Sequence, residues 1–183
     1  MKDADPEVDS LRGLGVHDAV AADAPTLAEL AARTFREAFA ADNHPADMRA
    51  HLESAYTPAL HLKEIEDPSI DTLLVRIYGG APIAYAQLRA GHVSNGVPAA
   101  GSVELWRFYV DAPWHGRGVA HGLMAAAKAR ARRRGATTLW LGVWERNARA
   151  HAFYGKHGFR KVGNQIFVVG SDPQTDDVML CDL

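Results

Sequence analysis

The stretch from Asp111 to Ala120 carries the residues best suited to chemistry, because its glycines join an apolar run to a helical pattern. Leu105 to Val110 predicts a strand, and His121 to Arg134 predicts a helix. Gly116 and Gly118 stand where the turn becomes the helix, and glycine lets a ligand approach the backbone closely. The first turn of a helix has unpartnered N–H groups and partial positive charge. The stretch therefore predicts a cradle for a phosphate or pyrophosphate.

The common nucleotide fingerprints do not fit this turn. The pattern Gly-x-x-x-x-Gly-Lys-Ser/Thr is absent from the sequence, and Gly-x-Gly-x-x-Gly fails by one residue because the third glycine is Gly122. No acidic residue ends the next strand, around Thr138 to Leu141, as a dinucleotide site would require. A turn that only joins a strand to a helix is the structural alternative.

The residues around and after the turn follow an order that resembles the GNAT superfamily of acetyl-CoA-dependent N-acetyltransferases. The matching residues are Phe108-Tyr109-Val110, then His115-Gly116-Arg117-Gly118-Val119-Ala120 in place of the family's Gln/Arg-x-x-Gly-x-Gly/Ala loop, then Asn147, Ala152-Phe153-Tyr154 and Gly158-Phe159. The match covers about a third of the chain. His115 departs from the usual Gln or Arg, and we expect this to change details of the site and not the identity of the cofactor.

The resemblance implies a fold of the α/β (α+β) class, the GNAT fold, with one mixed and mostly antiparallel sheet of about seven strands and helices on both faces. In that fold the strand ending at Val110 and the next strand, Leu139 to Val143, splay apart. The pantetheine arm of acetyl-CoA, the implied co-substrate, would lie in the gap. The implied cofactor-binding residues are Phe108, Tyr109, Val110, His115, Gly116, Arg117, Gly118, Val119, Ala120, His121, Asn147 and Tyr154.

The order of predicted elements agrees with such a fold. Residues 1–14 are polar and acidic and predict a loosely ordered arm, followed by a single domain over residues 15–183. Asp23 and Pro25 predict a helix start, as an N-cap acceptor and an early proline. The other predicted elements are a weak strand over 16–21, helices over 46–55, 59–66 and 147–156, a hairpin of strands over 72–78 and 82–89, and strands over 103–110, 139–143, 166–169 and 178–180.

Composition bounds the class of protein. A chain of 183 residues that is 48% hydrophobic suits one domain with one sizeable core. The net charge of −2 gives no overall attraction to nucleic acid or membrane. Cys181 is the only cysteine, so an internal disulfide is excluded and a reducing compartment is favoured. With neither a long apolar run nor a signal-like start, we expect a cytoplasmic protein; its oligomeric state stays open, a homodimer included.

Acetyl transfer to an amine sets the chemistry that the site must supply. A lysine-like ammonium has a pKa near 10.4, so its deprotonation costs about 4 kcal/mol at pH 7. A carboxylate can accept that proton, directly or through water, and the leaving thiolate needs a donor. The resemblance implies that Tyr154 is this donor; the alternative is an amphipathic core tyrosine. Asn147 and Tyr154 are seven residues apart and share a helix face, which would place both against the thiol arm.

The base is less closely defined by the sequence. The resemblance implies Glu104, at the start of the strand that leads to the glycine turn, and a strand-edge salt bridge is the alternative. Glu145, beside Asn147, is a second candidate. His92, His151 and His157 stand alone, and no spacing of His, Cys, Asp and Glu predicts a metal site.

A cluster of basic residues ends the helix that follows the turn: Lys128, Arg130, Arg132, Arg133 and Arg134. Interaction with the helix C-terminus and solvation is one interpretation, and attraction of the coenzyme's outer phosphate is the other.

A narrower resemblance covers nearly the whole chain after residue 16. Segments over 34–39, 43–48, 52–55, 140–147, 167–170 and 174–179 look like the PaiA-type branch of polyamine (spermidine/spermine) N-acetyltransferases. The implied partner is a small-molecule amine, whose pocket should present carboxylates. Asp42, Asp47 and Glu53 lie in the helices that flank the acceptor cleft in this fold, with a solvated surface role as the alternative.

Three other functions stay open. An acetyltransferase acting on a protein N-terminus or lysine would need a peptide-wide groove between the helix at 46–55 and the hairpin near 169–178. A non-catalytic acyl-CoA-binding sensor would hold the cofactor without turnover, although Tyr154 argues against it. A Rossmann-type nucleotide binder is the most distant.

Overall fold

The computed structural model describes residues 14–78 and 80–183. The arm predicted over residues 1–14 lies outside the described residues except for Leu14, which begins the first strand. In chain order the elements are β1 (Leu14–Asp18), α2 (Ala24–Phe39), α3 (Pro45–Ala55), α4 (Pro58–Glu66), β2 (Ile70–Ile77), β3 (Pro82–Ala90), β4 (Ser102–Val110), α5 (Val119–Arg133), β5 (Thr138–Trp144), α6 (Ala148–Lys156), β6 (Arg160–Val169) and β7 (Asp172–Asp182). Short 3-10 turns span Ala21–Asp23 and Ala112–Trp114.

The described strands form one seven-stranded sheet in the order β1-β2-β3-β4-β5-β7-β6. Within it β4 and β5 run parallel, and the other neighbouring pairs are antiparallel. A parallel pair needs a crossover connection, which α5 supplies. The prediction of a mixed, mostly antiparallel sheet of about seven strands with helices is confirmed.

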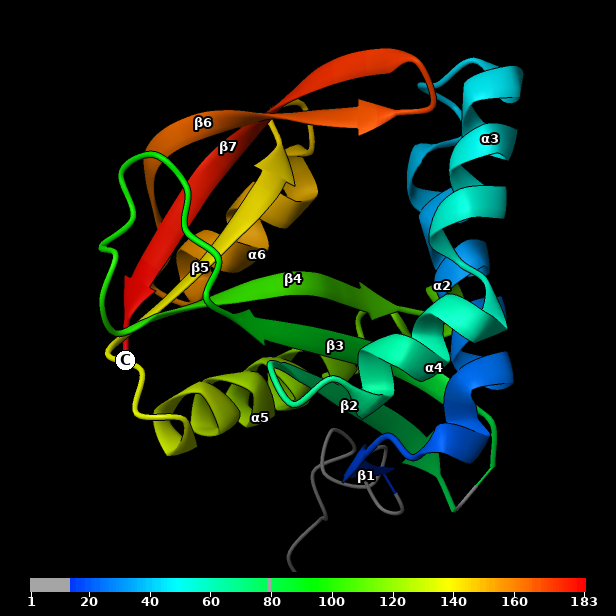
Figure 1. Cartoon of the computed structure of the whole chain (residues 1–183), viewed down its shortest axis with the longest axis horizontal. Helices are drawn as coiled ribbons and strands as arrows, with labels where there is room; N and C mark the ends of the chain where they lie inside the picture. The colour runs from blue at the N-terminus through cyan, green and yellow to red at the C-terminus, as the bar shows by residue number, and fades with distance from the viewer. Residues whose placement is uncertain (1–13, 79) are drawn as a thin grey trace, which may run out of the picture.

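The sheet opens between β4 and β5. These strands pair only where Ser102 to Glu104 face Thr138 to Trp140, and beyond that point they diverge (Figure 1). On its other side β4 carries a bulge, because Arg107 pairs with Gln87 while Leu105 pairs with Leu88, which leaves Trp106 as the extra residue. A bulge bends a strand and increases its twist, so it helps β4 turn away from β5.

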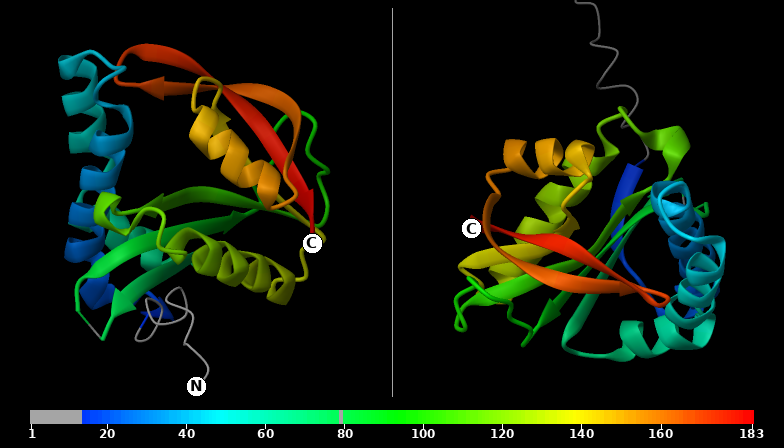
Figure 2. Two further views of the ribbon diagram at one scale, coloured as in Figure 1. Left: turned by 180° about the vertical axis from the view of Figure 1, so that it is seen from behind. Right: turned by 90° about the horizontal axis from the view of Figure 1, so that it is seen from above.

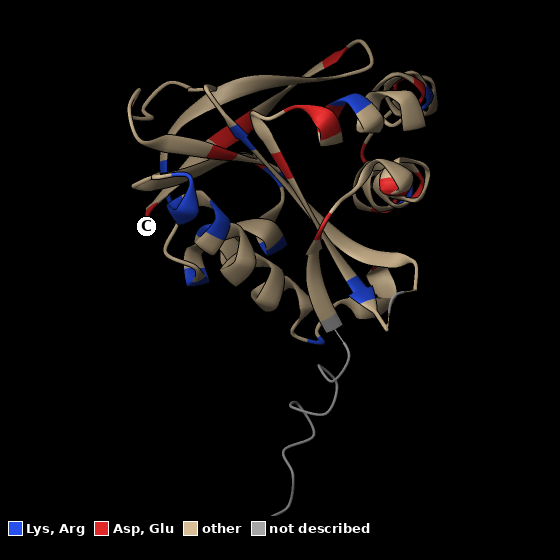
Figure 3. Ribbon diagram, turned by 60° about the horizontal axis from the view of Figure 1, so that its bottom comes forward, with Lys and Arg blue, Asp and Glu red and all other residues tan. Residues whose placement is uncertain are grey.

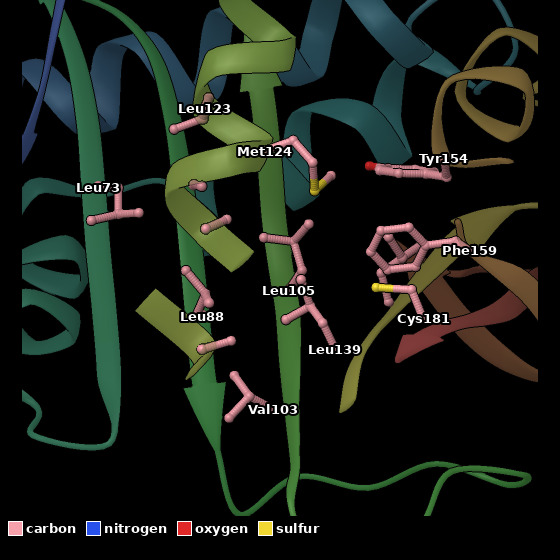
Figure 4. Packing of buried hydrophobic residues seen from close by; sticks show 14 of the residues in the cluster. Leu73, Leu88, Val103, Leu105, Leu123, Met124, Leu139, Tyr154, Phe159 and Cys181 are labelled. Carbon is pink, nitrogen blue, oxygen red and sulfur yellow. The ribbon is translucent and has the colours of Figure 1, made fainter. Parts of the chain in front are cut away.

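Two apolar cores lie on opposite faces of the sheet, as strand alternation requires. On one face Leu73 and Ala86 pack with Leu123 and Met124 of α5, and this core extends to α6 through Tyr154 (Figure 4). On the other face Leu74, Tyr85 and Val169 pack against Leu27, Leu30 and Phe35 of α2 and Met48 of α3. Figure 2 shows α5 and α6 on the same side of the sheet. Helices on both faces are thus confirmed.

Three local predictions need correction. Asp23 precedes α2 but does not cap it: its carboxylate accepts from the backbone N–H of Val20 at 3.0 Å and from Arg76 at 2.6 Å. The first strand ends at Asp18 and not at residue 21. The last two strands, β6 and β7, are much longer than the short apolar runs indicated, because most side chains of the edge strand β6 are exposed or half-buried and give no apolar alternation.

The basic end of α5 is tied to the first strands of the sheet. Arg130 pairs with Asp71 of β2 at 2.8 Å and with Asp18 of β1, and Arg134 also pairs with Asp71. Acidic and basic positions are intermingled along the ribbon (Figure 3). These two arginines therefore hold the helix to the sheet, a role that neither interpretation of the sequence included.

A buried polar network anchors α4 to the middle of the sheet. One oxygen of Glu64 accepts from Arg107 at 2.6 Å and from Gln87 at 3.1 Å, and it lies 2.8 Å from Nδ1 of His61. Burial raises the pKa of Glu64, but the His61 hydrogen bond and the charge and hydrogen bonds of Arg107 outweigh it and lower the pKa to about 2. The carboxylate therefore stays ionised and holds Arg107 in place.

We predict that Glu64→Ala lowers the free energy of unfolding by about 3–5 kcal/mol, because it leaves the Arg107 guanidinium buried without its carboxylate. Urea unfolding at pH 7 measures this loss. Since the folded pKa is depressed, the contribution of Glu64 is fully present above pH 4.5 and disappears as the pH falls toward about 2. Glu66→Ala, on the exposed side of the same helix, is the control and should change stability by less than about 0.5 kcal/mol. Equal losses in the two variants would contradict the prediction.

Candidate active site

A cleft of about 1490 Å³ occupies the opening between β4 and β5 and passes from one face of the sheet to the other. Toward the α5 and α6 face it is bounded by the glycine turn and by α6. Toward the α2 face it is bounded by α2, α3, β6 and β7. Two ligands that enter from opposite faces could therefore meet at its centre.

The glycine turn has the backbone geometry of an anion cradle. Gly116 and Gly118 adopt left-handed conformations, with φ of 73° and 78°, and α5 begins at the next residue. Within residues 14–78 and 80–183 no side chain caps this helix start, so the N–H groups of its first turn are available to a ligand. The turn lies on the cleft wall, whereas the Val119 side chain is buried in the core, so that only its backbone could contact a ligand.

His115 joins the cradle to its surroundings. Its Nε2 lies 2.8 Å from the carbonyl oxygen of Val110, and its Nδ1 lies 3.2 Å from Nη1 of Arg149. Since Arg149 can only donate, this contact requires Nδ1 to accept, and Nε2–H then donates to the Val110 carbonyl. Arg149 also lines the cleft and adds a positive charge beside the cradle, one that the sequence pattern did not reveal.

The end of β4 presents an unpaired backbone edge to the cleft, because its pairing with β5 stops at Glu104. Phe108 packs on Phe153 of α6 with ring centroids 5.7 Å apart, and Tyr109 stacks on Tyr85 at 5.6 Å on the opposite face. Phe108, Tyr109 and Val110 all line the cleft. Their free N–H and C=O groups could pair with an extended ligand arm as a strand would.

Tyr154 of α6 and Asn147, the residue that caps α6, both line the cleft. The Tyr154 ring packs against Phe108 and Phe159, and its hydroxyl points from α6 toward β4 (Figure 4). Burial raises the pKa of Tyr154 well above its ordinary value, so the hydroxyl is protonated throughout the physiological range. Asn147 caps α6 by accepting from the N–H of Ala150 at 3.1 Å.

His121 lies beside the cradle at the start of α5. Its Nδ1 is 2.9 Å from Nε2 of His157, the residue at the C-terminal end of α6. Burial lowers the pKa of His157, helped by the charges of His121 and Lys128. His121 lines the cleft, and His157 does not.

Glu104 lies at the bottom of the opening, where β4 and β5 part. It is only 3% exposed, and its Oε2 accepts from Nε of Arg89 at 2.5 Å. Glu104 therefore forms a salt bridge, which was the alternative to a role as base, and it also lines the cleft. Glu145, the second candidate base, is exposed and lies outside the cleft wall.

Asp176 is a cleft residue to which the sequence assigned no role. It lies on β7, faces Trp144 of β5 and Gln165 of β6, and is 9% exposed. Burial, and secondarily the charge of Asp177, raise the pKa of Asp176 to about 6. An aspartate within a polar stretch carries no periodic signal, and the predicted final strand began only at Val178.

The carboxylates expected to flank an acceptor pocket lie elsewhere. Asp47 accepts from the N–H of Ser171 at 2.7 Å and from its hydroxyl at 2.8 Å, Glu53 lines a separate shallow hollow on α3, and Asp42 is exposed. Their surface interpretation is the correct one. The acidic residues that do line the cleft are Glu37, Glu104 and Asp176.

The described residues hold no group of three His, Cys, Asp or Glu side chains placed to bind a metal ion. Among the helices of the described chain, none has the length and apolar character needed to cross a membrane.

Comparison with known proteins decides the family. The model of the acetyltransferase (GNAT) family matches residues 26–159, which are most of the chain. The chain belongs to this family. An uncharacterised N-acetyltransferase of Mycobacterium bovis is 34% identical over 161 residues, which cover 88% of this chain and 98% of the relative. The resemblance to the GNAT family seen in the sequence is thus confirmed.

Solved structures of acetyltransferases show the same fold. The PaiA N-acetyltransferase of Thermoplasma acidophilum in complex with coenzyme A has a TM-score of 0.76 at 20% identity, with 93% of this chain and 99% of that chain covered. The protein YncA of Salmonella typhimurium with its cofactor acetyl-CoA has a TM-score of 0.70 at 18% identity, with 93% and 94% covered. At these identities the likeness shows the GNAT fold.

We predict that Asp176→Asn stabilises the free protein at neutral pH by about 3 kcal/mol. The carboxyl of Asp176 titrates near 3.8 when unfolded and near 6 when folded, so the folded state binds more protons in this window and its stability falls as the pH rises through it. Urea unfolding at pH 3.5 and 7.5 should show no gain at the lower pH and the full gain at the higher. Asp182→Asn, exposed on the same strand, should give no such pH-dependent gain. A wild type at least as stable as Asp176→Asn at pH 7.5 would contradict the prediction.

Proposed function

We propose that the protein transfers the acetyl group of acetyl-CoA to the primary amine of a small cationic molecule, by direct attack in a ternary complex. The observation that carries this proposal is the cleft through the sheet, with an anion cradle and Tyr154 on one face and carboxylates on the other. Solved relatives of the same fold hold coenzyme A or acetyl-CoA, which supports the choice of cofactor.

The cofactor would bind along the α5 and α6 face. Its pyrophosphate would accept hydrogen bonds from the N–H groups of the turn over 116–120, with Arg149 and His121 close by. Its pantetheine arm would pair with the free edge of β4 at 108–110. The Asn147 amide and the Tyr154 hydroxyl would then face the thiol end of the arm.

The reaction needs one proton acceptor and one proton donor. As the amine nitrogen attacks the thioester carbonyl, an N–C bond forms and the C–S bond breaks, so the sulfur must gain a proton. Tyr154 supplies it, and because burial raises the pKa of this hydroxyl, its transfer must be concerted with loss of the thiolate. Glu104 is the base that the sequence predicts, and it would act through water because Arg89 occupies one of its oxygens.

The acceptor side favours a small molecule over a peptide. The hydrogen bonds from Ser171 to Asp47 fasten the turn between β6 and β7 to α3, and Figure 1 shows the turn beside this helix. A Cβ on Gly170 would lie 2.5 Å from the Asp47 backbone, so this contact is tight. The wide groove that a peptide acceptor would need between α3 and the hairpin is therefore closed at this end.

The walls of the acceptor side suit a cationic amine such as spermidine or spermine. Phe35, Phe39, Tyr56 and Phe167 line it, and aromatic faces attract cations. Glu37 on α2 adds a carboxylate at a distance from the centre, where a second ammonium of a polyamine would lie. The structural likeness to the PaiA enzyme supports this choice within the family.

We predict that the purified protein releases free thiol from acetyl-CoA when spermidine or spermine is present, and much less with a lysine peptide of equal concentration. The closed contact between α3 and the hairpin is the physical reason. A thiol-reactive dye measures the release, and wells without amine give the background. Release with the peptide alone would support a protein acetyltransferase, and acetyl-CoA binding without release in any well would support a sensor.

We predict that Tyr154→Phe lowers kcat by about 10²–10⁴-fold while the Kd for acetyl-CoA changes less than threefold, because the hydroxyl protonates the leaving sulfur and the ring provides the packing. Steady-state kinetics and calorimetric titration measure the two quantities. Tyr78→Phe, which removes an exposed hydroxyl, is the matched control. If affinity falls as much as the rate, Tyr154 is a binding residue and the proposed role is wrong.

A further inference from the structure

Asp176 is a nearly buried carboxylate that joins no ion pair with another described residue. It contrasts with the other buried acidic side chains among the described residues, Glu64, Glu104 and Asp177. Glu104 pairs with Arg89 at 2.5 Å, Glu64 pairs with Arg107, and the neighbouring Asp177 pairs with Lys161 at 2.6 Å. A carboxylate removed from water without a cationic partner carries a desolvation cost, and Asp176 carries this cost on the wall of the cleft.

The wall is hollowed where this carboxylate lies. A Cβ built on Gly142 of β5 would stand 3.1 Å from Oδ2 of Asp176 and 2.5 Å from Nε2 of Gln165. The glycine therefore leaves room for two polar side chains that a larger residue would displace. All three residues line the cleft, so the carboxylate is open to a ligand.

Strand register places Asp176 on the acceptor side. Directly paired residues point to the same face of a sheet, and Asp176 pairs with Trp144. Trp144 and Trp140 lie on the same face of β5, and Trp140 pairs with Glu104. Asp176 and Glu104 therefore point to the same face. Tyr154 approaches from the opposite face, through α6 and its core. An amine held by Asp176 would thus stand across the opening from the proton donor.

The charged and titratable groups around Asp176 do not neutralise it. Tyr109 of β4 is near, and burial raises its pKa, so it stays uncharged. Asp177 adds a like charge. On the helices that complete the cleft, Glu37 is acidic and burial lowers the pKa of His51, which favours its neutral form. Arg107, a cation of the cleft wall, donates instead to Glu64 and Gln87.

We propose that Asp176 binds the ammonium group of the acceptor and receives its proton, so that Asp176 and not Glu104 is the base. Glu104, which pairs with Arg89 at the base of the opening, is then a positioning residue. This inference rests on the proposed function and names its acceptor class, an aliphatic amine that is cationic at neutral pH. The N–H bond breaks, Asp176 gains the proton and releases it to water, and the freed lone pair forms the N–C bond. As the C–S bond breaks, the sulfur gains the proton of Tyr154. The second proton leaves the nitrogen for water as the amide forms, and Tyr154 regains a proton from water.

This assignment excludes acceptors that lack a positive charge. An arylamine is neutral at pH 7 and would leave the carboxylate without a partner, so it should react far more slowly than an aliphatic amine of similar size. Selectivity of this kind follows when a buried charge must be satisfied by the substrate.

The test compares Asp176→Asn with Glu104→Gln and wild type, using acetyl-CoA with spermidine and, in parallel, benzylamine and aniline. We expect Asp176→Asn to lower kcat/KM for spermidine at least 100-fold with acetyl-CoA affinity unchanged, and to abolish the preference for benzylamine over aniline. Glu104→Gln should retain that preference. Asp176→Glu should recover part of the activity, and Asp182→Asn, which removes an exposed charge from the same strand, should match wild type.

The pH profile separates this role from a structural one. In wild type, kcat/KM for spermidine should rise tenfold per pH unit up to about pH 6 and then level, and Asp176→Asn should lack this limb. A limb that continues to rise toward pH 9–10 would show that the free amine in solution reacts, which overturns the proposal. So would a loss of less than threefold in Asp176→Asn, or loss of the limb in Glu104→Gln alone.

Binding gives a readout that does not depend on turnover. Calorimetric titration of spermidine into the protein saturated with coenzyme A should show binding to wild type and at least tenfold weaker binding to Asp176→Asn. Wild type that binds spermidine through Asp176 but never releases thiol would refute the proposed transferase function while supporting the ammonium site. Equal binding by both proteins would refute the site even if acetyl transfer occurs.

Discussion

The three backbone pairs between β4 and β5 are the constraint on which the rest of this structure depends. They hold two parallel strands together at Ser102 to Glu104 and release them beyond it, so one sheet becomes two diverging halves. The bulge at Trp106 turns β4 away, and the cleft fills the opening. Because backbone hydrogen bonds of β4 are left unused there, the same divergence creates both the space for a ligand and the groups that can bind it.

Charge is distributed so that the supporting parts of the molecule are neutralised internally. Glu64 and Arg107 fix α4 to the sheet, Arg130 and Arg134 fix α5 through Asp71, and Glu104 is held by Arg89 at the closed end of the opening. Such pairs orient elements more than they add stability, since desolvation offsets much of their attraction. Asp176 differs from these groups, because it is buried on the cleft wall and forms no ion pair with another described residue.

The two faces of the cleft divide the chemistry between them. The N–H groups at the start of α5, which no described side chain caps, and the positive side chain of Arg149 suit the phosphates of a coenzyme. Aromatic rings and carboxylates on the other face suit an ammonium. The fold alone does not select the acceptor, because one scaffold can serve enzymes that act on different amines. Selection of the acceptor depends on the residues that line the second face.

The sequence by itself determined the parts of this protein that rest on local backbone rules. The glycines at 116 and 118, the hairpin near Gly80 and the spacing of Asn147 and Tyr154 specify conformations within a few residues, and the motif order defined the family. Only the tertiary structure brought Asp176 beside Gly142, because that contact is set by the register of β5, β6 and β7 and not by any neighbour in sequence. For the same reason the partners of Arg130 and Glu104 could not be read from the chain, since long side chains pair with whichever opposite charge the fold brings within reach.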